Sequence, residues 1–275
     1  MKNFVTGFGC LFILSFGFSQ DAIHFTMGLL PNNRYDQSVT QKIRIELNLD
    51  SSTAVMIAKM EANGVKNPTV QEQETSMVAT TISGSLNKQT GKIPVTMTII
   101  KSDENLARVL TPETKFHGTS RLNEMPAYDS ISGITLQENQ KQQMLKAMSS
   151  LSQINLPNRS LAPGQSDTLH TPINIPVGGV TLKMDYITIY HLKSIREKTA
   201  LFDVEANFVL NMEVKDLPIA GYGSGAGSME YDLEKHYPAV YKLKYKIIMR
   251  IAREGLVLHM NMISDLNSIS KVQAL

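Results

Sequence analysis

Apolar and polar residues alternate with a period of two through much of the C-terminal part of the chain. From Ala200 to Val214 every even position is apolar, and most of the odd positions between them are polar. Successive side chains of a β-strand point to opposite faces of a sheet, so this pattern predicts one long strand with an apolar and a polar face. Similar alternation predicts further long strands, over residues 167–176, 180–192, 239–251 and from 256 onward. Because strands much longer than about five or six residues twist and coil strongly, we expect the sheet to be curved.

The N-terminal half alternates less regularly but also favours strands. A strand is predicted over residues 35–49, and a hairpin over 70–86 and 92–100 with its turn at 87–91. A further strand is predicted near 115–121. These segments therefore predict a second antiparallel meander.

Two segments favour helices. Residues 54–62 follow two serines, are rich in Ala and Met, and end at Asn-Gly, which favours a short helix with a strand as the alternative. Residues 136–151 begin at a capping box formed by Thr135 and Glu138. The second helix has a narrow apolar stripe, which we expect to pack on the sheet: Met144, Leu145, Met148 and Leu151.

Together these elements predict a mainly β protein. The expected architecture is a long-stranded antiparallel curved sheet or half-barrel, made of two meander halves, with one or two short helices packed on it. The turn-rich segment 156–164 is interpreted as a linker. We therefore divide the chain into an N-terminal β-rich half, 20–155, which contains the helix 136–151, and a C-terminal meander half, 156–275.

The first nineteen residues have the features of a cleaved signal peptide. Lys2 precedes an apolar run over residues 4–18, and the small residues Gly17 and Ser19 form a cleavage site before Gln20. Export to the periplasm or cell surface of a Gram-negative bacterium is therefore expected. The only cysteine lies inside this run, and no second apolar run is long enough to predict a transmembrane segment in the mature chain.

Charge and motifs argue against several functions. The chain has 27 basic and 25 acidic residues, a balance that gives nucleic-acid binding no electrostatic support. No Gly-x-Ser-x-Gly motif is present, and no Ser-x-x-Lys stands at a helix start, so we expect neither catalytic residues nor cofactors. Gly221–Ala226 matches a dinucleotide fingerprint by spacing, but no βαβ pattern surrounds it. We interpret this segment as a flexible loop or glycine bulge between strands.

Two charged clusters have functional and structural interpretations. Asp232, Glu234 and His236 alternate along a predicted strand and have metal-ligating side chains, but they lie on its solvent face, so no metal site is expected. Lys242, Lys244, Lys246 and Arg250 form a cationic row on another strand. The row suits lipid headgroups or an anionic glycan, whereas a cross-strand charge ladder is the favoured interpretation. Its expected acidic partners are Asp203, Glu205 and Glu213.

Three passages resemble a family of uncharacterised secreted β-rich envelope proteins of Gram-negative bacteria. They are residues 128–133 before a helix, 156–166 before a new set of strands, and the glycine-rich run 221–227. The family usually has Gly-Asp-Ser-Trp where this chain has Gly-Gln-Ser-Asp at 164–167. At the level of fold, the long curved sheet with a covering helix also resembles periplasmic carriers that shelter the acyl chains of lipoproteins. The resemblance implies an envelope protein without an established activity.

The apolar face of the C-terminal strands is rich in methionine and tyrosine. Methionine adapts to varied apolar shapes, and tyrosine combines an apolar ring with a polar tip. We therefore predict binding of a lipid or other apolar ligand on this concave face, or else an ordinary core. The candidate ligand-binding residues are Met184, Tyr186, Tyr190, Met212, Tyr245, Met249, Met260 and Met262. The alternative function is a structural module that binds another envelope protein through strand edges or loops.

Overall fold

The protein is described here from a computed structural model. It describes residues 22–50, 54–64, 66–107, 110–151, 157, 159–177, 180–214, 217–253 and 256–275. The predicted signal peptide, residues 1–19, lies outside the described residues.

The two predicted meanders are present and form one sheet. The N-terminal meander consists of β2 (Asn33–Leu49), β3 (Thr69–Ser83), β4 (Ile93–Ser102), β5 (Lys115–Ser120) and β6 (Ala127–Ser132). The C-terminal meander consists of β8 (Ser166–Val177), β9 (Val180–Arg196), β10 (Thr199–Val214), β11 (Leu217–Asp232), β12 (Tyr237–Arg253) and β13 (Leu256–Ala274). The first and last long strands, β2 and β13, pair antiparallel along their whole length and join the meanders into an 11-stranded sheet.

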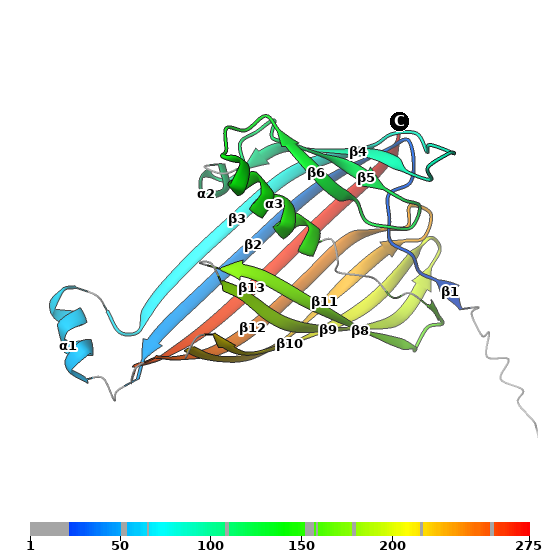
Figure 1. The fold of residues 1–275 in the computed structure, drawn as a ribbon. Helices are drawn as coiled ribbons and strands as arrows, with labels where there is room; N and C mark the ends of the chain where they lie inside the picture. Colours follow the sequence, from blue (N-terminus) through cyan, green and yellow to red (C-terminus); the bar gives the residue numbers. More distant parts are fainter. Residues whose placement is uncertain are drawn as a thin grey trace, which may run out of the picture.

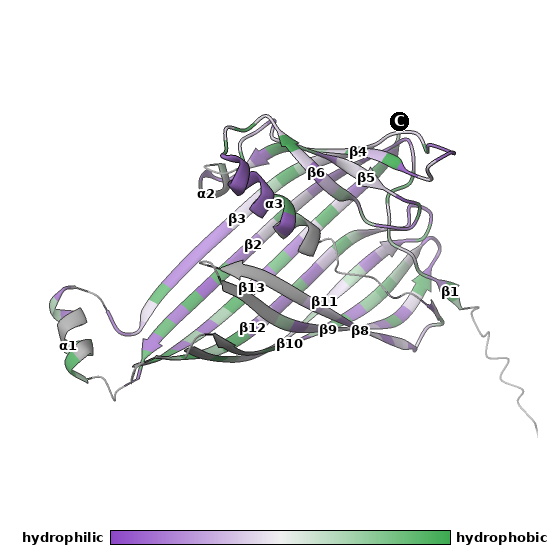
Figure 2. Cartoon of the chain, viewed as in Figure 1, coloured by the Kyte–Doolittle hydropathy of each residue, from purple (hydrophilic) through white to green (hydrophobic). Residues whose placement is uncertain are grey.

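The sheet is strongly curved but open. Its edges are β6 and β8, so it does not close into a barrel (Figure 1). Strand β13 has 19 residues and extends about 60 Å at about 3.3 Å per residue. Figure 2 shows hydrophobic and hydrophilic residues alternating along the long strands. The predicted fold class, a long-stranded antiparallel curved sheet with short helices, is confirmed.

The glycine-rich segment differs from its prediction as a loop or bulge. It lies inside β11, which pairs with both β10 and β12 across Gly221–Gly227. These glycines face the concave side, where a Cβ on Gly227 would lie 1.8 Å from the Lys242 carbonyl oxygen. Gly223 lies between Phe208 and Ile247 in register, and both of these side chains are buried in one cluster. The glycines thus allow a sharp bend of the sheet, with larger inward side chains on the neighbouring strands.

The predicted linker also contributes to the core. Within it, β7 (Ser160–Leu161) pairs with β1 (Ile23–His24) in a separate two-stranded sheet. Leu161 is fully buried, and Phe25 packs edge-on against Phe202 and Tyr231 at centroid distances of 5.0 and 5.4 Å. These apolar side chains cover the inner face of β10 and β11, so this part of the segment is not a free linker.

In the part of the chain that the structure describes, three short helices accompany the sheet: α1 (Ala54–Ala62), α2 (Glu104–Ala107) and α3 (Glu138–Leu151). The predicted helices at 54–62 and 136–151 are thus present. Figure 1 shows α3 lying across the open side of the sheet, where it contacts both edge strands, β6 and β8. Among the described residues no helix is long and apolar enough to span a bilayer.

The cap of α3 is displaced from the predicted one. The helix begins at Glu138, so Gln137 takes the capping position, and its backbone N–H donates to Oε1 of Gln140 at 3.1 Å. The side-chain contact of a capping box is therefore made by Gln140, two residues beyond the predicted Glu138.

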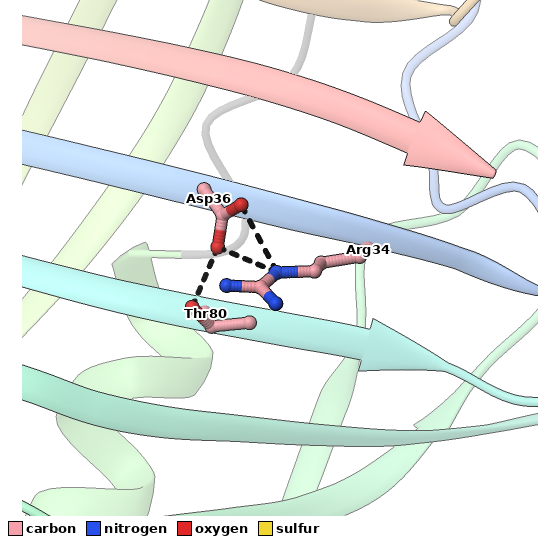
Figure 3. A network of polar contacts seen from close by, with 3 residues as sticks. All are labelled: Arg34, Asp36 and Thr80. Atoms are coloured by element: carbon pink, nitrogen blue, oxygen red, sulfur yellow. Dashed lines mark hydrogen bonds and ion pairs between the residues drawn. The ribbon is translucent and has the colours of Figure 1, made fainter. Parts of the chain in front are cut away.

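A polar network on the convex face supports the register near the junction of the two meanders (Figure 3). The Asp36 carboxylate accepts hydrogen bonds from Thr80 Oγ1 at 2.6 Å and from Arg34 Nε at 2.9 Å. Burial raises the pKa of Asp36, but these hydrogen bonds and the charges of Arg34 and Lys271 outweigh it, so the pKa lies below its usual value. Lys271 lies opposite Asp36 on β13, so the network connects three strands.

Candidate apolar ligand site

The space between α3 and the inner face of β2–β5 contains two apolar cavities. The larger has a volume of about 290 Å³, and its apolar walls include Val39, Met77, Ile99, Leu110 and Phe116. The smaller has a volume of about 170 Å³, and its apolar walls include Leu29, Met125 and Pro126. Both cavities open to solvent, and apolar side chains make up most of their exposed walls.

Two methionines separate the cavities. Met97 from β4 and Met148 from α3 line both of them. Met97 is almost fully buried, whereas Met148 is half-buried. Methionine side chains are unbranched and have several rotatable bonds, so they can change shape at small cost. Met97 and Met148 thus form a wall that the two cavities share.

Helix α3 covers the cavities because its sequence has a single apolar stripe. Met144, Leu145 and Met148 recur at helical spacing, while most of its other positions are Gln, Lys, Asn or Ser. Leu145 is buried against a cluster that includes Ile99 and Phe116 of the sheet. The helix is therefore held to the sheet by a few apolar side chains, and it forms a narrow cover.

The polar groups around the cavities are neutral amides, hydroxyls and phenols. Among the described residues, no Asp, Glu, Lys, Arg or His lines either cavity. Gln37 Nε2 donates to the Tyr237 hydroxyl at 2.8 Å. Gln41 Nε2 donates to Ser264 Oγ at 3.0 Å and to the Tyr245 hydroxyl at 3.3 Å. Both amides are thus fixed by partners from the C-terminal meander.

Burial keeps the phenols of this region protonated. It raises the pKa of Tyr128 to about 12, with a partly opposing hydrogen bond to Thr81. Burial, with the nearby phenols of Tyr128 and Tyr35, also raises the pKa of Tyr237. The site therefore offers hydrogen bonds without charge at neutral pH, which suits a neutral or apolar ligand.

The residues predicted as ligand-binding lie on the strands that continue this concave face. Five of them pack together around Phe208: Met184, Tyr186, Tyr245, Met249 and Met262. Tyr186 stacks on Phe208 at a centroid distance of 4.9 Å. Tyr190 is fully buried in a neighbouring cluster that includes Phe202 and Phe25.

The other two predicted residues lie on β10 and β13. Met260 is opposite Met249 and Leu47 in register. Met212 is opposite Ile219, and its side chain lies outside the described part of the structure. Neither cavity beneath α3 is lined by any of the eight predicted residues.

The cavity residues were not singled out by sequence reasoning. Met77 and Met97 belong to the predicted hairpin, and Met148 belongs to the predicted apolar stripe of the helix. The apolar and polar pattern of the hairpin and of the helix already indicated that these residues face the core. What the sequence did not indicate was which part of the concave face would remain unfilled.

The candidate metal ligands do not share a strand face. Residues 233–236 form a turn, in which Asp232 Oδ1 accepts hydrogen bonds from the backbone N–H groups of Glu234 and Lys235 at 2.8 and 2.9 Å. The Glu234 carboxylate pairs with Lys198 Nζ at 2.7 Å. Asp232 therefore supports the β11–β12 turn, Glu234 pairs with the turn between β9 and β10, and the expected alternation along one strand is not present.

No protein-family model matches the sequence, and no curated protein matches it significantly.

Proposed function

We propose that the protein is an exported, non-enzymatic envelope protein that binds the acyl chain of a lipid, or a similar neutral apolar molecule, between α3 and the sheet. The observation that carries the proposal is the pair of adjoining cavities on either side of Met97 and Met148. Export is supported by the signal-like pattern of residues 1–19. The resemblance to periplasmic carriers of lipoprotein acyl chains agrees with this function.

The size and chemistry of the cavities favour a chain-like ligand. The larger cavity, about 290 Å³, is near the lower end of the range for ligand sites. A flexible chain can pass from one small cavity to the next, whereas a bulky ring system cannot. Each buried CH₂ group contributes about 0.8 kcal/mol, so a few such groups already give useful affinity.

Strand addition by another envelope protein is the weaker alternative. The longer edge strand, β8, contains Pro172 and Pro176, which lack a backbone N–H and are typical of protected sheet edges. The other edge strand, β6, is only six residues long and is contacted by α3. Neither edge favours pairing with a partner strand.

Native mass spectrometry of the protein as processed by the expressing host tests the proposal, together with Nile red titration after delipidation. We expect a lipid-sized adduct, and Nile red fluorescence that is competed by extracted lipid. Met148→Trp fills the space shared by both cavities, so its affinity for Nile red should fall by about tenfold, the equivalent of two lost CH₂ contacts.

Met262→Trp is the matched control, because Met262 lies in the packed cluster around Phe208. It should alter stability but leave the affinity for Nile red unchanged. If only the Met262 variant loses the dye, the ligand lies on the C-terminal face. An adduct-free protein that does not bind Nile red would overturn the proposal.

A further inference from the structure

The convex face of β12 has an exposed cationic row. Lys242, Lys244, Lys246 and Arg250 are exposed and point away from the core, because they alternate with buried residues such as Leu243 and Ile247. Alternate residues of a strand are about 7 Å apart, so the row, which spans four such steps, extends over about 27 Å. The whole chain has a net charge of only +2, so this is a local concentration of positive charge.

The row lacks the acidic partners expected of a charge ladder. None of the ion pairs between described residues involves it. Asp203 and Glu205 lie on β10, which β11 separates from β12, and Asp203 instead pairs with Lys193 at 3.2 Å. Glu213 has a side chain outside the described part of the structure. The predicted charge ladder is therefore wrong for Asp203 and Glu205, because neither residue lies on a strand next to β12.

The flanking strands differ in charge. Across β11, the residues opposite Lys242, Lys244 and Lys246 are small and neutral. They are Ser228, Ala226 and Ser224. On β13, Asp265 lies opposite Lys244, and the β13 residues opposite the other three cations are not acidic.

The neighbouring cations on β2 are neutralised. Lys42 and Arg44 each pair at 3.4 Å with an acid of β3, Glu74 and Glu72 respectively. The charge of the β12 row is therefore the part of this face that remains available to an external anion.

An exposed apolar strip crosses the row. Tyr222 on β11 is 64% exposed, and Val209 on β10 is 47% exposed. They lie side by side in register with Ile248, which is located between Lys246 and Arg250 on the outward side of β12. Cationic and apolar side chains, with an exposed tyrosine among them, thus share one continuous surface.

We propose that this surface, defined by the β12 cations with Val209, Tyr222 and Ile248, docks on an anionic phospholipid bilayer. Lys and Arg attract anionic headgroups, and tyrosine is favoured at the level of the headgroups because its ring is apolar and its tip polar. Binding to a bilayer generally needs two signals, and this surface supplies both a basic row and apolar side chains. A soluble acidic glycan would need only the cations. This inference is independent of the ligand proposed beneath α3.

Flotation with vesicles tests the inference, using phosphatidylcholine alone and phosphatidylcholine mixed with phosphatidylglycerol. The protein should float only with the anionic vesicles, and high salt should release it. Lys242→Gln with Lys246→Gln should weaken binding by about fivefold per cation. Tyr222→Ser should weaken it by a similar factor, and that loss should persist when salt is varied.

The control is Lys88→Gln with Lys92→Gln, two exposed lysines of the β3–β4 turn. It removes the same charge elsewhere and should leave vesicle binding unchanged. Equal loss in this control would overturn the inference, as would wild-type protein that does not float. Binding to dextran sulfate with vesicle binding insensitive to Tyr222→Ser would assign the row to a soluble polyanion instead. Nile red affinity, measured in parallel, reports separately on the cavities.

Discussion

The two meanders have the same alternation of apolar and polar residues but fill their concave faces differently. In the C-terminal meander, Phe208 and Ile247 lie on either side of Gly223 and belong to one cluster of packed side chains. In the N-terminal meander, the inner face is covered by α3, and space remains around Met97 and Met148. A glycine-rich strand lets a sheet bend until side chains of its two neighbouring strands meet. A helix that crosses a sheet contacts it only along one stripe of side chains.

This difference assigns separate roles to the two regions. The packed meander supplies stability and fixes the curvature, and it holds the amides of Gln37 and Gln41 through Tyr237 and Tyr245. The covered meander contains the two cavities in which we propose that a ligand binds. The following changes test that contrast.

The largest expected effect is on the glycine strand. In Gly227→Ala the new Cβ would lie 1.8 Å from the Lys242 carbonyl oxygen, so the β11–β12 pair must separate. We expect the free energy of unfolding to fall by about 4 kcal/mol, measured by chemical denaturation. Ala226→Val enlarges the exposed face of the same strand and should change stability by less than about 0.5 kcal/mol. If Gly227→Ala is equally mild, the glycines do not set the curvature.

Truncation of one large side chain in each region compares their packing directly. Phe208 is 8% exposed and contacts Tyr186 and Tyr245, so Phe208→Ala should cost about 3–5 kcal/mol. Met148 is half-buried and already borders empty space, so Met148→Ala should cost about 1–2 kcal/mol. Chemical denaturation of the ligand-free wild type and variants measures both losses in the free energy of unfolding. Similar losses would mean that α3 packs as tightly as the C-terminal strands.

Replacing a valine with leucine should change stability in opposite directions in the two regions. Val39 lines the larger cavity, so Val39→Leu fills space and should stabilise the protein by about 0.5–1 kcal/mol. Val204 is 1% exposed in a filled cluster, so Val204→Leu should destabilise it by about 1–3 kcal/mol. Thermal unfolding in the absence of lipid gives both values. Destabilisation by Val39→Leu would indicate that the cavity cannot accept an added methylene.

Much of the fold was accessible from the sequence because it depends on local alternation. Most strands of both meanders and the helix 136–151 follow from periods of two and 3.6 residues, but the short strand β6 was not predicted. The glycine-rich part of β11 was missed, because the glycines at 221, 223, 225 and 227 leave no inward side chains from which to measure a period. The bend it permits depends on close contact with β10 and β12, which single-strand patterns do not contain.

The unfilled part of the concave face was less predictable than the face itself. Sequence reasoning favoured the C-terminal methionines and tyrosines, since methionine adapts to varied apolar shapes and tyrosine combines an apolar ring with a polar tip. The two cavities beneath α3 lie on the N-terminal meander, and their position depends on where α3 crosses from β6 to β8, a long-range contact. The pairing of β2 with β13 is equally non-local, and alternation alone does not specify it.

The smallest expected effect concerns Asp36, which supports the junction between the meanders without contacting either core. Its pKa in the folded protein lies below the usual value, so the ionised carboxylate stabilises the fold above the usual titration range of aspartate. That contribution is lost as the pH falls through the lowered pKa of the folded state. Because the side chain is 33% exposed, Asp36→Asn should cost less than about 1 kcal/mol at neutral pH. Unfolding free energies of wild type and variant, measured against pH, should converge in acid; a constant difference would show that the carboxylate acts through packing, without a contribution from its charge.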